Sequence, residues 1–223
     1  MKQPQLFYSL LLFIVLAVPW IYLAIVYDDL PSTIATHFGI NEMPDAFGPR
    51  NNIFIGPLTL SAVGAGIYFL LKNLYRIDPK RKYTPATSGI LSNIAMLINL
   101  LFAAIMLFII NWTLHGKIQS FSILFCVMGL FIAYIGNLMH SIKPNYFAGY
   151  RLPWTLENED NWRRTHQLAS KVLFIGGIAI AILSLLVSSG PAIFIFITAM
   201  SLMTIIPAVY SYKIYKQSLK KQL

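Results

Sequence analysis

The sequence predicts an all-α polytopic membrane protein, a bundle of six transmembrane helices with both termini in the cytoplasm. Three observations lead to this prediction. The chain of 223 residues is 57% hydrophobic and only 11% charged, whereas a soluble domain carries about 25% charged residues. Its apolar residues occur in runs long enough to cross a hydrocarbon core about 30 Å thick. Its Lys and Arg residues are divided unequally between alternate connections.

Six apolar segments are predicted to span the membrane, at residues 6–26, 53–71, 89–110, 121–139, 172–187 and 192–210. The first is interpreted as an uncleaved signal anchor, because it is longer than a usual signal-peptide core and no A-x-A-like site follows it. Only Ser188-Ser189-Gly190-Pro191 separates the last two. Because Gly-Pro is a strong turn signal, a tight hairpin is favoured over a single helix that would overshoot the bilayer.

The orientation follows from the positive-inside rule. With the N-terminus in the cytoplasm, 15 of the 17 Lys and Arg residues lie inside, and only Arg50 and Lys117 lie outside. The net charge of +9 is therefore a signal of topology and gives no reason to expect direct nucleic-acid binding. The single cysteine, Cys126, lies in the fourth span, so no intramolecular disulfide can form.

We predict three parts along the chain. Residues 1–71 form a two-helix unit whose helices are joined by a long extracellular loop at 27–52. Residues 72–88 form a basic cytoplasmic connection, interpreted as a membrane-surface anchor that fixes the topology. Residues 89–223 form a four-helix unit with a cytoplasmic loop at 140–170.

The extracellular loop contains Pro and Gly too often for a regular element, so a series of defined turns is expected. Its candidate residues are Pro31, His37, Gly39, Pro44, Asp45 and Gly48. The side chains of His37, Glu42 and Asp45 are of metal-binding types, but a metal site needs three or four ligands and this spacing matches no known motif. A histidine hydrogen-bonded to carboxylates within a structured loop is favoured, and no metal or other cofactor is predicted.

The cytoplasmic loop contains the stretch KPNYFAGYRLPWTLENEDNWRRTH, residues 143–166. Pro144 ends the fourth span, because the residue before proline avoids the helical region. Gly149 offers a position with positive φ. A short interfacial helix that leads into the fifth span should follow, capped by Thr155 or Asn158. The pairs Glu159–Arg163 and Asp160–Arg164 have the favourable i,i+4 order.

The aromatic residues of this stretch have two interpretations. Trp and Tyr are enriched at membrane interfaces, so Tyr146, Tyr150, Trp154 and Trp162 could be anchors alone. The alternative is a functional surface, with Trp162, Thr165 and His166 on one helix face. In that surface Asn145 and Gly149 shape a turn, Arg151 pairs with a carboxylate or a lipid phosphate, and Trp154 packs the loop against the bundle.

The stretch resembles the SdpI family of bacterial membrane proteins, whose signature reads N-Y-F-x-G-x-R-x-P-W-T-L followed by W-x-x-T-H. The matching residues are Asn145, Tyr146, Phe147, Gly149, Arg151, Pro153, Trp154, Thr155, Leu156, Trp162, Thr165 and His166. The extracellular loop is similar to an uncharacterised domain often found at the N-terminus of such proteins, through the Pro, His, Gly, Pro-Asp and Gly residues named above.

The resemblance implies a multi-pass protein of the bacterial plasma membrane that gives immunity to a secreted toxic peptide of the sporulation-delaying type. It also implies a signalling arm, in which a cytosolic repressor is held at the membrane when toxin is present. The implied partners are therefore membrane lipids, a toxin peptide outside and a repressor inside. The resemblance implies no catalytic activity and no cofactor.

Two other classes of function stay open. A small-molecule or lipid transporter would use polar groups inside the spans, such as Ser92, Asn99 and Asn137, although the spans contain no Asp, Glu, Lys or Arg. A membrane-embedded enzyme would use His140 or His166 near the acidic residues of the cytoplasmic loop. The chain contains no G-x-S-x-G, H-E-x-x-H or phosphate-binding motif.

Overall fold

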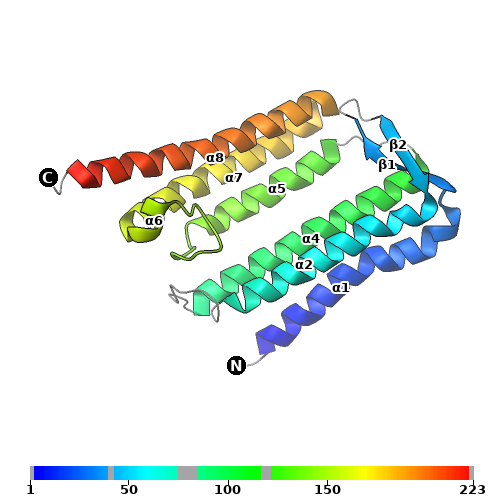
Figure 1. Ribbon diagram of the computed structural model, residues 1–223, viewed down its shortest axis with the longest axis horizontal. Helices are drawn as coiled ribbons and strands as arrows, with labels where there is room; N and C mark the ends of the chain where they lie inside the picture. Colours follow the sequence, from blue (N-terminus) through cyan, green and yellow to red (C-terminus); the bar gives the residue numbers. More distant parts are fainter. Residues whose placement is uncertain (1–2, 40–42, 75–84, 117–121, 221–223) are drawn as a thin grey trace.

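The computed structural model describes residues 3–39, 43–74, 85–116 and 122–220. Its long helices are α1 (Gln3–Val26), α2 (Ile55–Lys72), α4 (Pro85–His115), α5 (Ser122–Met139), α7 (Glu159–Leu186) and α8 (Ser189–Lys220). Among the described residues these are the six helices long and apolar enough to cross a membrane. They run along the long axis of the molecule, and both chain termini lie at one end (Figure 1). The predicted fold class is confirmed.

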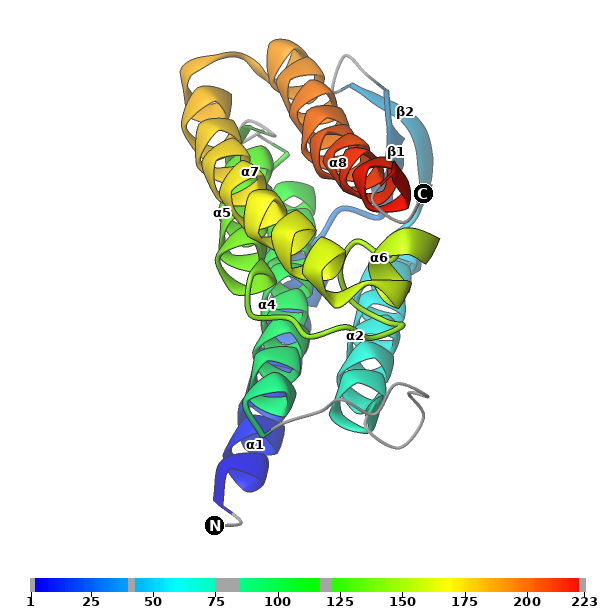
Figure 2. The ribbon, with the colours of Figure 1, turned by 90° about the vertical axis from the view of Figure 1, so that its left-hand side faces the viewer.

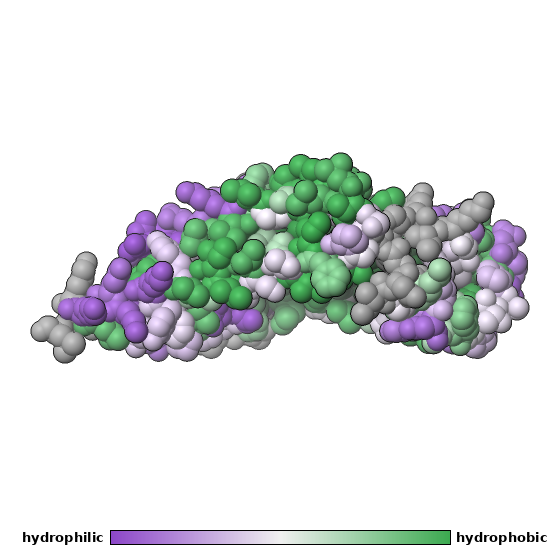
Figure 3. Space-filling model, turned by 90° about the horizontal axis from the view of Figure 1, so that it is seen from above, coloured by the Kyte–Doolittle hydropathy of each residue, from purple (hydrophilic) through white to green (hydrophobic). Residues whose placement is uncertain are grey.

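The surface of the helices is apolar along their middle. Viewed from above, a hydrophobic region occupies the centre and hydrophilic residues gather at both ends (Figure 3). Phe13, Ile25 and Leu186 are more than 70% exposed. Such exposure would favour aggregation in water, but it is the normal state of side chains that face lipid. The long axis of the bundle is therefore the membrane normal.

The helix predicted to start near Asn158 is continuous with the fifth span, which therefore begins earlier than predicted. A single helix, α7, runs from Glu159 to Leu186, after the five-residue helix α6 (Pro153–Glu157). Asn158 caps α7, because its side chain accepts a hydrogen bond from the N–H of Asn161 at 2.9 Å. No proline follows this cap before Pro191, so the helix continues from the interface into the membrane. Similarly, α8 continues ten residues beyond the predicted end of the sixth span.

The prediction that the extracellular loop has no regular element is wrong, because it forms a β-hairpin. Strand β1 (Thr33–Phe38) pairs antiparallel with β2 (Pro44–Pro49), and the 3₁₀ helices η1 (Tyr27–Asp29) and η2 (Arg50–Phe54) flank the pair. The two prolines of β2 stand at its first and last positions, where a strand tolerates the missing N–H. Thr33 and Ile34 are β-branched, which favours the extended backbone of β1.

The hairpin is fixed to the extracellular ends of the helices by apolar contacts. Ile34 of β1 is 4% exposed and belongs to a buried cluster with residues of α1, η2 and α4, including Leu23 and Ile110. Phe38 meets the ring of Trp112 edge-on, with centroids 4.5 Å apart. The hairpin therefore has a fixed position on the bundle, at the opposite end from the termini (Figure 1).

The helices pack as two groups of three. Helices α1, α2 and α4 form one, and α5, α7 and α8 form the other, with less extensive contact between α4 and α5. In the first group, Asn99 Nδ2 of α4 donates to the carbonyl of Gly64 in α2 at 3.1 Å. In the second, Gly129 of α5 lies against Gly177 of α7. The packing thus places α4 with the first two helices, while the predicted division assigns its residues to the later part of the chain.

Parts of the sequence predictions lie outside the described residues. They are Glu42 of the candidate metal ligands, Lys117 of the extracellular charges and residues 75–84 of the basic connection.

Candidate functional site

Asn145 folds the cytoplasmic loop after α5 onto itself. Its side chain is 2% exposed. Oδ1 accepts the backbone N–H groups of Phe147 and Ala148, at 2.8 and 2.7 Å, and Nδ2 donates to the carbonyl of Lys143 at 2.8 Å. An asparagine that satisfies several backbone groups in this way replaces the hydrogen bonds of a regular element. A short irregular segment thereby acquires a defined shape.

Gly149 brings the loop into contact with His166 of α7. Its φ of 108° lies in the region open almost only to glycine, and an added Cβ would overlap His166 Nε2. The next residue, Tyr150, donates its backbone N–H to that nitrogen at 3.1 Å. His166 Nδ1 in turn lies 2.8 Å from the carbonyl of Trp162. Both bonds are satisfied when the ring is neutral and carries its proton on Nδ1.

Thr155 holds the turn into α6. Its hydroxyl accepts the N–H of Leu152 at 2.9 Å and donates to the carbonyl of Tyr150 at 2.6 Å. Pro153 is the first residue of α6, a position that favours proline because its missing N–H needs no partner there. The sequence R-L-P-W-T therefore forms a compact corner.

Three side chains connect this corner and the start of α7 to α8. Trp154 Nε1 donates to Ser211 Oγ at 3.0 Å, and its ring stacks on Tyr215 with centroids 5.7 Å apart. Asn161 Nδ2 donates to the backbone carbonyl of Ser211 at 3.0 Å. Tyr150 Oη donates to the backbone carbonyl of Met203 at 2.7 Å. The loop is thus attached to α8 at two levels.

The hydrogen bond from Tyr150 replaces one that is missing within α8. Residue 207 is a proline, which has no N–H to donate to the carbonyl of Met203 four residues earlier. The hydroxyl of Tyr150 takes that place. Burial raises the pKa of Tyr150 to about 12, so the phenol stays protonated and remains a donor throughout the physiological pH range.

Replacing Tyr150 with Phe should therefore lower stability by about 1–3 kcal/mol, the usual effect of leaving one buried polar group without its partner. The ring itself and its contact with His166 would remain. Tyr134→Phe is the matched control, because Tyr134 is a 42% exposed residue of α5. Thermal unfolding of the detergent-solubilised protein measures both variants. Equal unfolding midpoints for the two variants would contradict this role of the hydroxyl.

Of the ten predicted residues of the loop, five are buried, three are exposed, and Gly149 and Trp154 are half-buried. The buried set consists of Asn145, Thr155, Trp162, Thr165 and His166, each at most 2% exposed. Together with Gly149 we call it the motif core. Trp162 stacks on His166 with centroids 4.0 Å apart, and its Nε1 donates to the carbonyl of Ile142 at 2.8 Å. The structure thus brings residues 145–166 into one packed unit.

The exposed set consists of Tyr146, Arg151 and Pro153. Arg151 Nη1 donates to the backbone carbonyl of Tyr146 at 2.7 Å, so among the described residues the first of its two predicted partners, a carboxylate, is not the one it binds. The expected pair Glu159–Arg163 is also replaced, since Arg163 pairs with Asp160 one turn earlier on the helix. The predicted pair Asp160–Arg164 is present, at 3.7 Å.

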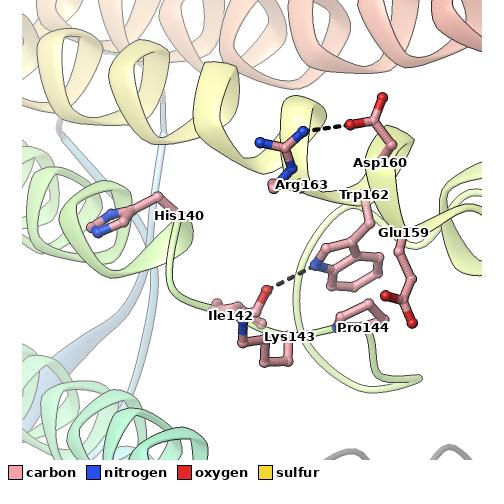
Figure 4. Close-up of a pocket in the computed structure, with 8 residues that line it drawn as sticks. All are labelled: His140, Ile142, Lys143, Pro144, Glu159, Asp160, Trp162 and Arg163. Carbon is pink, nitrogen blue, oxygen red and sulfur yellow. Dashed lines mark hydrogen bonds and ion pairs between the residues drawn. The ribbon is translucent and has the colours of Figure 1, made fainter.

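A polar pocket of about 270 Å³ lies between the end of α5 and the start of α7. Figure 4 shows its lining residues: His140, Ile142, Lys143, Pro144, Glu159, Asp160, Trp162 and Arg163. The rim carries charges of both signs, and the indole of Trp162 forms one wall. Such a pocket suits a peptide or protein side chain better than a bare metal ion. Within the described residues no group of three or more His, Cys, Asp or Glu side chains could hold a metal.

The candidate residues of the extracellular loop lie at the other end of the molecule (Figure 1). His37 of β1 and Asp45 of β2 pair across the hairpin, with Nδ1 and Oδ1 2.6 Å apart. The N–H of Gly39 donates to the carbonyl of Met43 at 3.0 Å and closes the turn. Pro31 precedes β1, and Pro44 and Gly48 belong to β2. These residues shape the hairpin and are not part of one site with the motif core.

Sequence reasoning missed Asn161 and Ser211, and it treated Tyr150 only as a possible anchor. Their partners are 50 and 53 residues away along the chain. One signal could have indicated such a contact, namely Pro207, which requires a donor for the carbonyl of residue 203. Figure 2, a view from the end that carries the termini, shows α6 and the preceding loop beside the end of α8.

Comparison with known proteins gives two family matches. Residues 141–211 match the SdpI/YfhL protein family, and residues 14–60 match a domain of unknown function, DUF1648. The first range begins at the motif loop and ends at Ser211, so it contains the motif core and the residues of α8 to which Tyr150, Trp154 and Asn161 donate hydrogen bonds. The second contains the β-hairpin.

The chain is also similar to two individual proteins. The chain is 28% identical to "Immunity protein SdpI" of Bacillus subtilis (strain 168) over 193 residues, which are 86% of this chain and 88% of that protein. It is 39% identical over 59 residues, 26% of this chain, to 32% of an uncharacterized protein of Archaeoglobus fulgidus. No solved structure matches the chain. The predicted resemblance is confirmed: this is a multi-pass membrane protein whose residues 141–211 match the SdpI/YfhL protein family.

Proposed function

We propose that this chain is an immunity-type membrane protein that protects the bacterium that makes it against a secreted antimicrobial peptide. The observation that carries the proposal is the similarity to Immunity protein SdpI, which extends over 86% of this chain and 88% of that protein. A match of this extent includes both the hairpin and the motif core. Protection against a peptide of the sporulation-delaying type is the specific activity proposed.

The outer end of the molecule offers a surface for such a peptide. Met43 and Phe47 are 62% and 63% exposed on the hairpin, and the carboxylate of Asp45 lies beside them in the sequence. Exposed apolar side chains next to a negative charge suit a hydrophobic, cationic peptide. The hairpin is anchored on α1, η2 and α4 through Ile34. A peptide bound to the hairpin would therefore act directly on the first group of helices.

Survival of a sensitive bacterium tests this function. The parent chain should raise the peptide concentration that stops growth. Trp154→Ala removes the stacking on Tyr215 and the bond to Ser211, and should reduce the protection at least about tenfold, given the few kcal/mol that such a truncation costs. Trp154→Phe, which keeps a ring, should have a smaller effect. Phe13→Ala is the control, because Phe13 is 71% exposed to lipid on α1.

Membrane abundance of each variant is measured by immunoblot, so that loss of protection is not confused with loss of protein. No protection by an abundant parent would overturn the proposed function. If Trp154→Ala protected as well as the parent, the motif loop would not be needed for the proposed function.

Signalling to a cytosolic repressor is a second candidate function, favoured by the charged pocket beside Trp162. Arg163→Glu would reverse one rim charge, whereas Lys213→Glu, on the exposed end of α8, would change the same charge elsewhere. A fluorescent fusion of the candidate repressor should move to the membrane when toxin is added to cells with the parent or Lys213→Glu. It should stay in the cytoplasm with Arg163→Glu. Equal recruitment by both variants would exclude the pocket as the contact.

A further inference from the structure

An open, apolar groove of about 520 Å³ lies between α5 and α8, beside the motif loop. Phe131, Ile135 and Met139 of α5 form one wall, and α8 forms the other with residues that include Thr204. Residues 149–152 of the loop line its end. The groove belongs neither to the polar pocket nor to the extracellular hairpin.

The end of the groove carries a cation. Arg151 lines it and is exposed. A guanidinium has five N–H donors, and the structure commits Nη1 to the carbonyl of Tyr146. That bond holds the side chain at the loop, and no carboxylate of the described residues pairs with its positive charge. The fork of an arginine matches the geometry of a phosphate or a carboxylate group.

The groove extends from the motif loop into the membrane span. Met139 is the last residue of α5, so the walls lie within the membrane span and Arg151 lies just beyond it. By the distribution of Lys and Arg, this is the cytoplasmic side. Basic pockets between transmembrane helices on this side bind the head groups of anionic lipids.

The volume favours a lipid chain over a peptide helix. A helix with its side chains is about 10–12 Å across, so a groove of about 520 Å³ would hold little more than one turn of it. An acyl chain is much thinner and can extend along the groove from the loop toward the membrane centre. We propose that the groove binds one acyl chain of an anionic phospholipid, whose phosphate contacts Arg151.

Native mass spectrometry of the full-length, detergent-released protein tests this site, with phosphatidylglycerol and phosphatidylcholine as probes. The parent should retain one phosphatidylglycerol about tenfold more strongly than phosphatidylcholine, the scale of one charge-assisted contact. Arg151→Gln should bind the two lipids equally. Arg151→Lys should keep part of the preference, because the charge remains.

The second arm fills the groove without touching Arg151. Thr204→Trp places a large side chain in the apolar wall and should abolish retention of the lipid. Ser201→Trp is the matched control: Ser201 is also exposed on α8, its hydroxyl bonds to the carbonyl four residues earlier as that of Thr204 does, and it does not line the groove. It should bind lipid like the parent.

Equal retention of the two lipids by the parent would overturn the proposal and leave only ordinary lipid around the protein. An equal loss of lipid retention in Thr204→Trp and Ser201→Trp would also overturn the proposal. Displacement of phosphatidylglycerol by a hydrophobic cationic peptide, with the preference abolished at equal concentrations, would assign the groove to the peptide instead. Because the readout is lipid mass, a chain that failed to give immunity could still pass this test.

Discussion

Gly149→Ala should destabilise the protein by about 2–4 kcal/mol and abolish protection. A non-glycine residue at a φ of 108° is strained by about 1–3 kcal/mol. The added Cβ would also displace the ring of His166, whose Nε2 accepts the N–H of Tyr150. Loss of that bond adds about 1 kcal/mol. The midpoint of thermal unfolding in detergent, together with survival under toxin, measures both consequences.

Gly66→Ala is the control for this prediction. Gly66 lies in α2, and a Cβ there would meet nothing within 4 Å, so the change should be neutral or slightly stabilising because alanine favours helix. If Gly149→Ala unfolded at the same temperature as the parent, the loop would have to adopt another conformation. The contact between Tyr150 and His166 would then not be required.

The six spans could be predicted because burial in lipid needs no partner within the chain. A window of about 20 apolar residues is sufficient, and its signal does not depend on which helix packs beside it. Helix ends were less predictable. The extension of α7 back to Glu159 depends on Asn158 as a cap, and the sequence offered Thr155 as an equal alternative.

The hairpin was missed because its prolines and glycines were counted without their positions. Pro44 and Pro49 end β2, and Gly48 lies opposite Ile34 within the ladder. Residues that exclude a central strand are compatible with a two-stranded hairpin whose strands are both edges. Whether a strand is central or at an edge depends on the strand with which it pairs. The residue pattern of one segment does not reveal that partner.

The motif could be identified from the sequence, but the structural role of its residues could not. Five of its twelve residues are buried, and buried side chains such as those of Asn145 and Thr155 bond to the backbone of the loop. Such residues determine the shape of the loop and do not themselves contact a partner. The residues that a ligand or partner can reach are the exposed ones, including Tyr146, Arg151 and Arg163. Substitutions in the motif core should therefore affect every activity, and substitutions at exposed positions should separate them.

The contacts with α8 connect this loop to the rest of the second helix group. Tyr150 bonds to α8 at Met203, and Trp154 bonds to it at Ser211. α8 in turn packs along α7, which packs along α5. A change at the loop therefore reaches all three helices, whereas the hairpin is anchored on the other group. Communication between the two ends must cross the contact between the two groups, where Ile94 of α4 is buried with Met139 of α5 and Trp162 of α7.

The second large effect on stability is expected at the close contact between α5 and α7, which we call the seam. There Gly129 lies against Gly177. A Cβ on Gly177 would lie 2.5 Å from the backbone N of Ala133 and 2.6 Å from the carbonyl oxygen of Gly129. Backbone atoms cannot rotate away, so Gly177→Ala should force the two helices apart and cost about 1–3 kcal/mol, the usual range for overpacking. Close approach through small residues is a main source of helix association in lipid.

The neighbouring glycine provides the control. A Cβ on Gly176 would meet Met203 Sδ at 2.5 Å, but methionine is flexible and its side chain can adjust. Gly176→Ala should therefore lower the unfolding midpoint much less than Gly177→Ala, although the two residues are adjacent on one helix. Equal unfolding midpoints for Gly177→Ala and Gly176→Ala would mean that α5 and α7 can separate at little cost in free energy. In that case the second group would not be a rigid unit, and α5 could shift against α7 and α8 while the loop stayed bonded to α8.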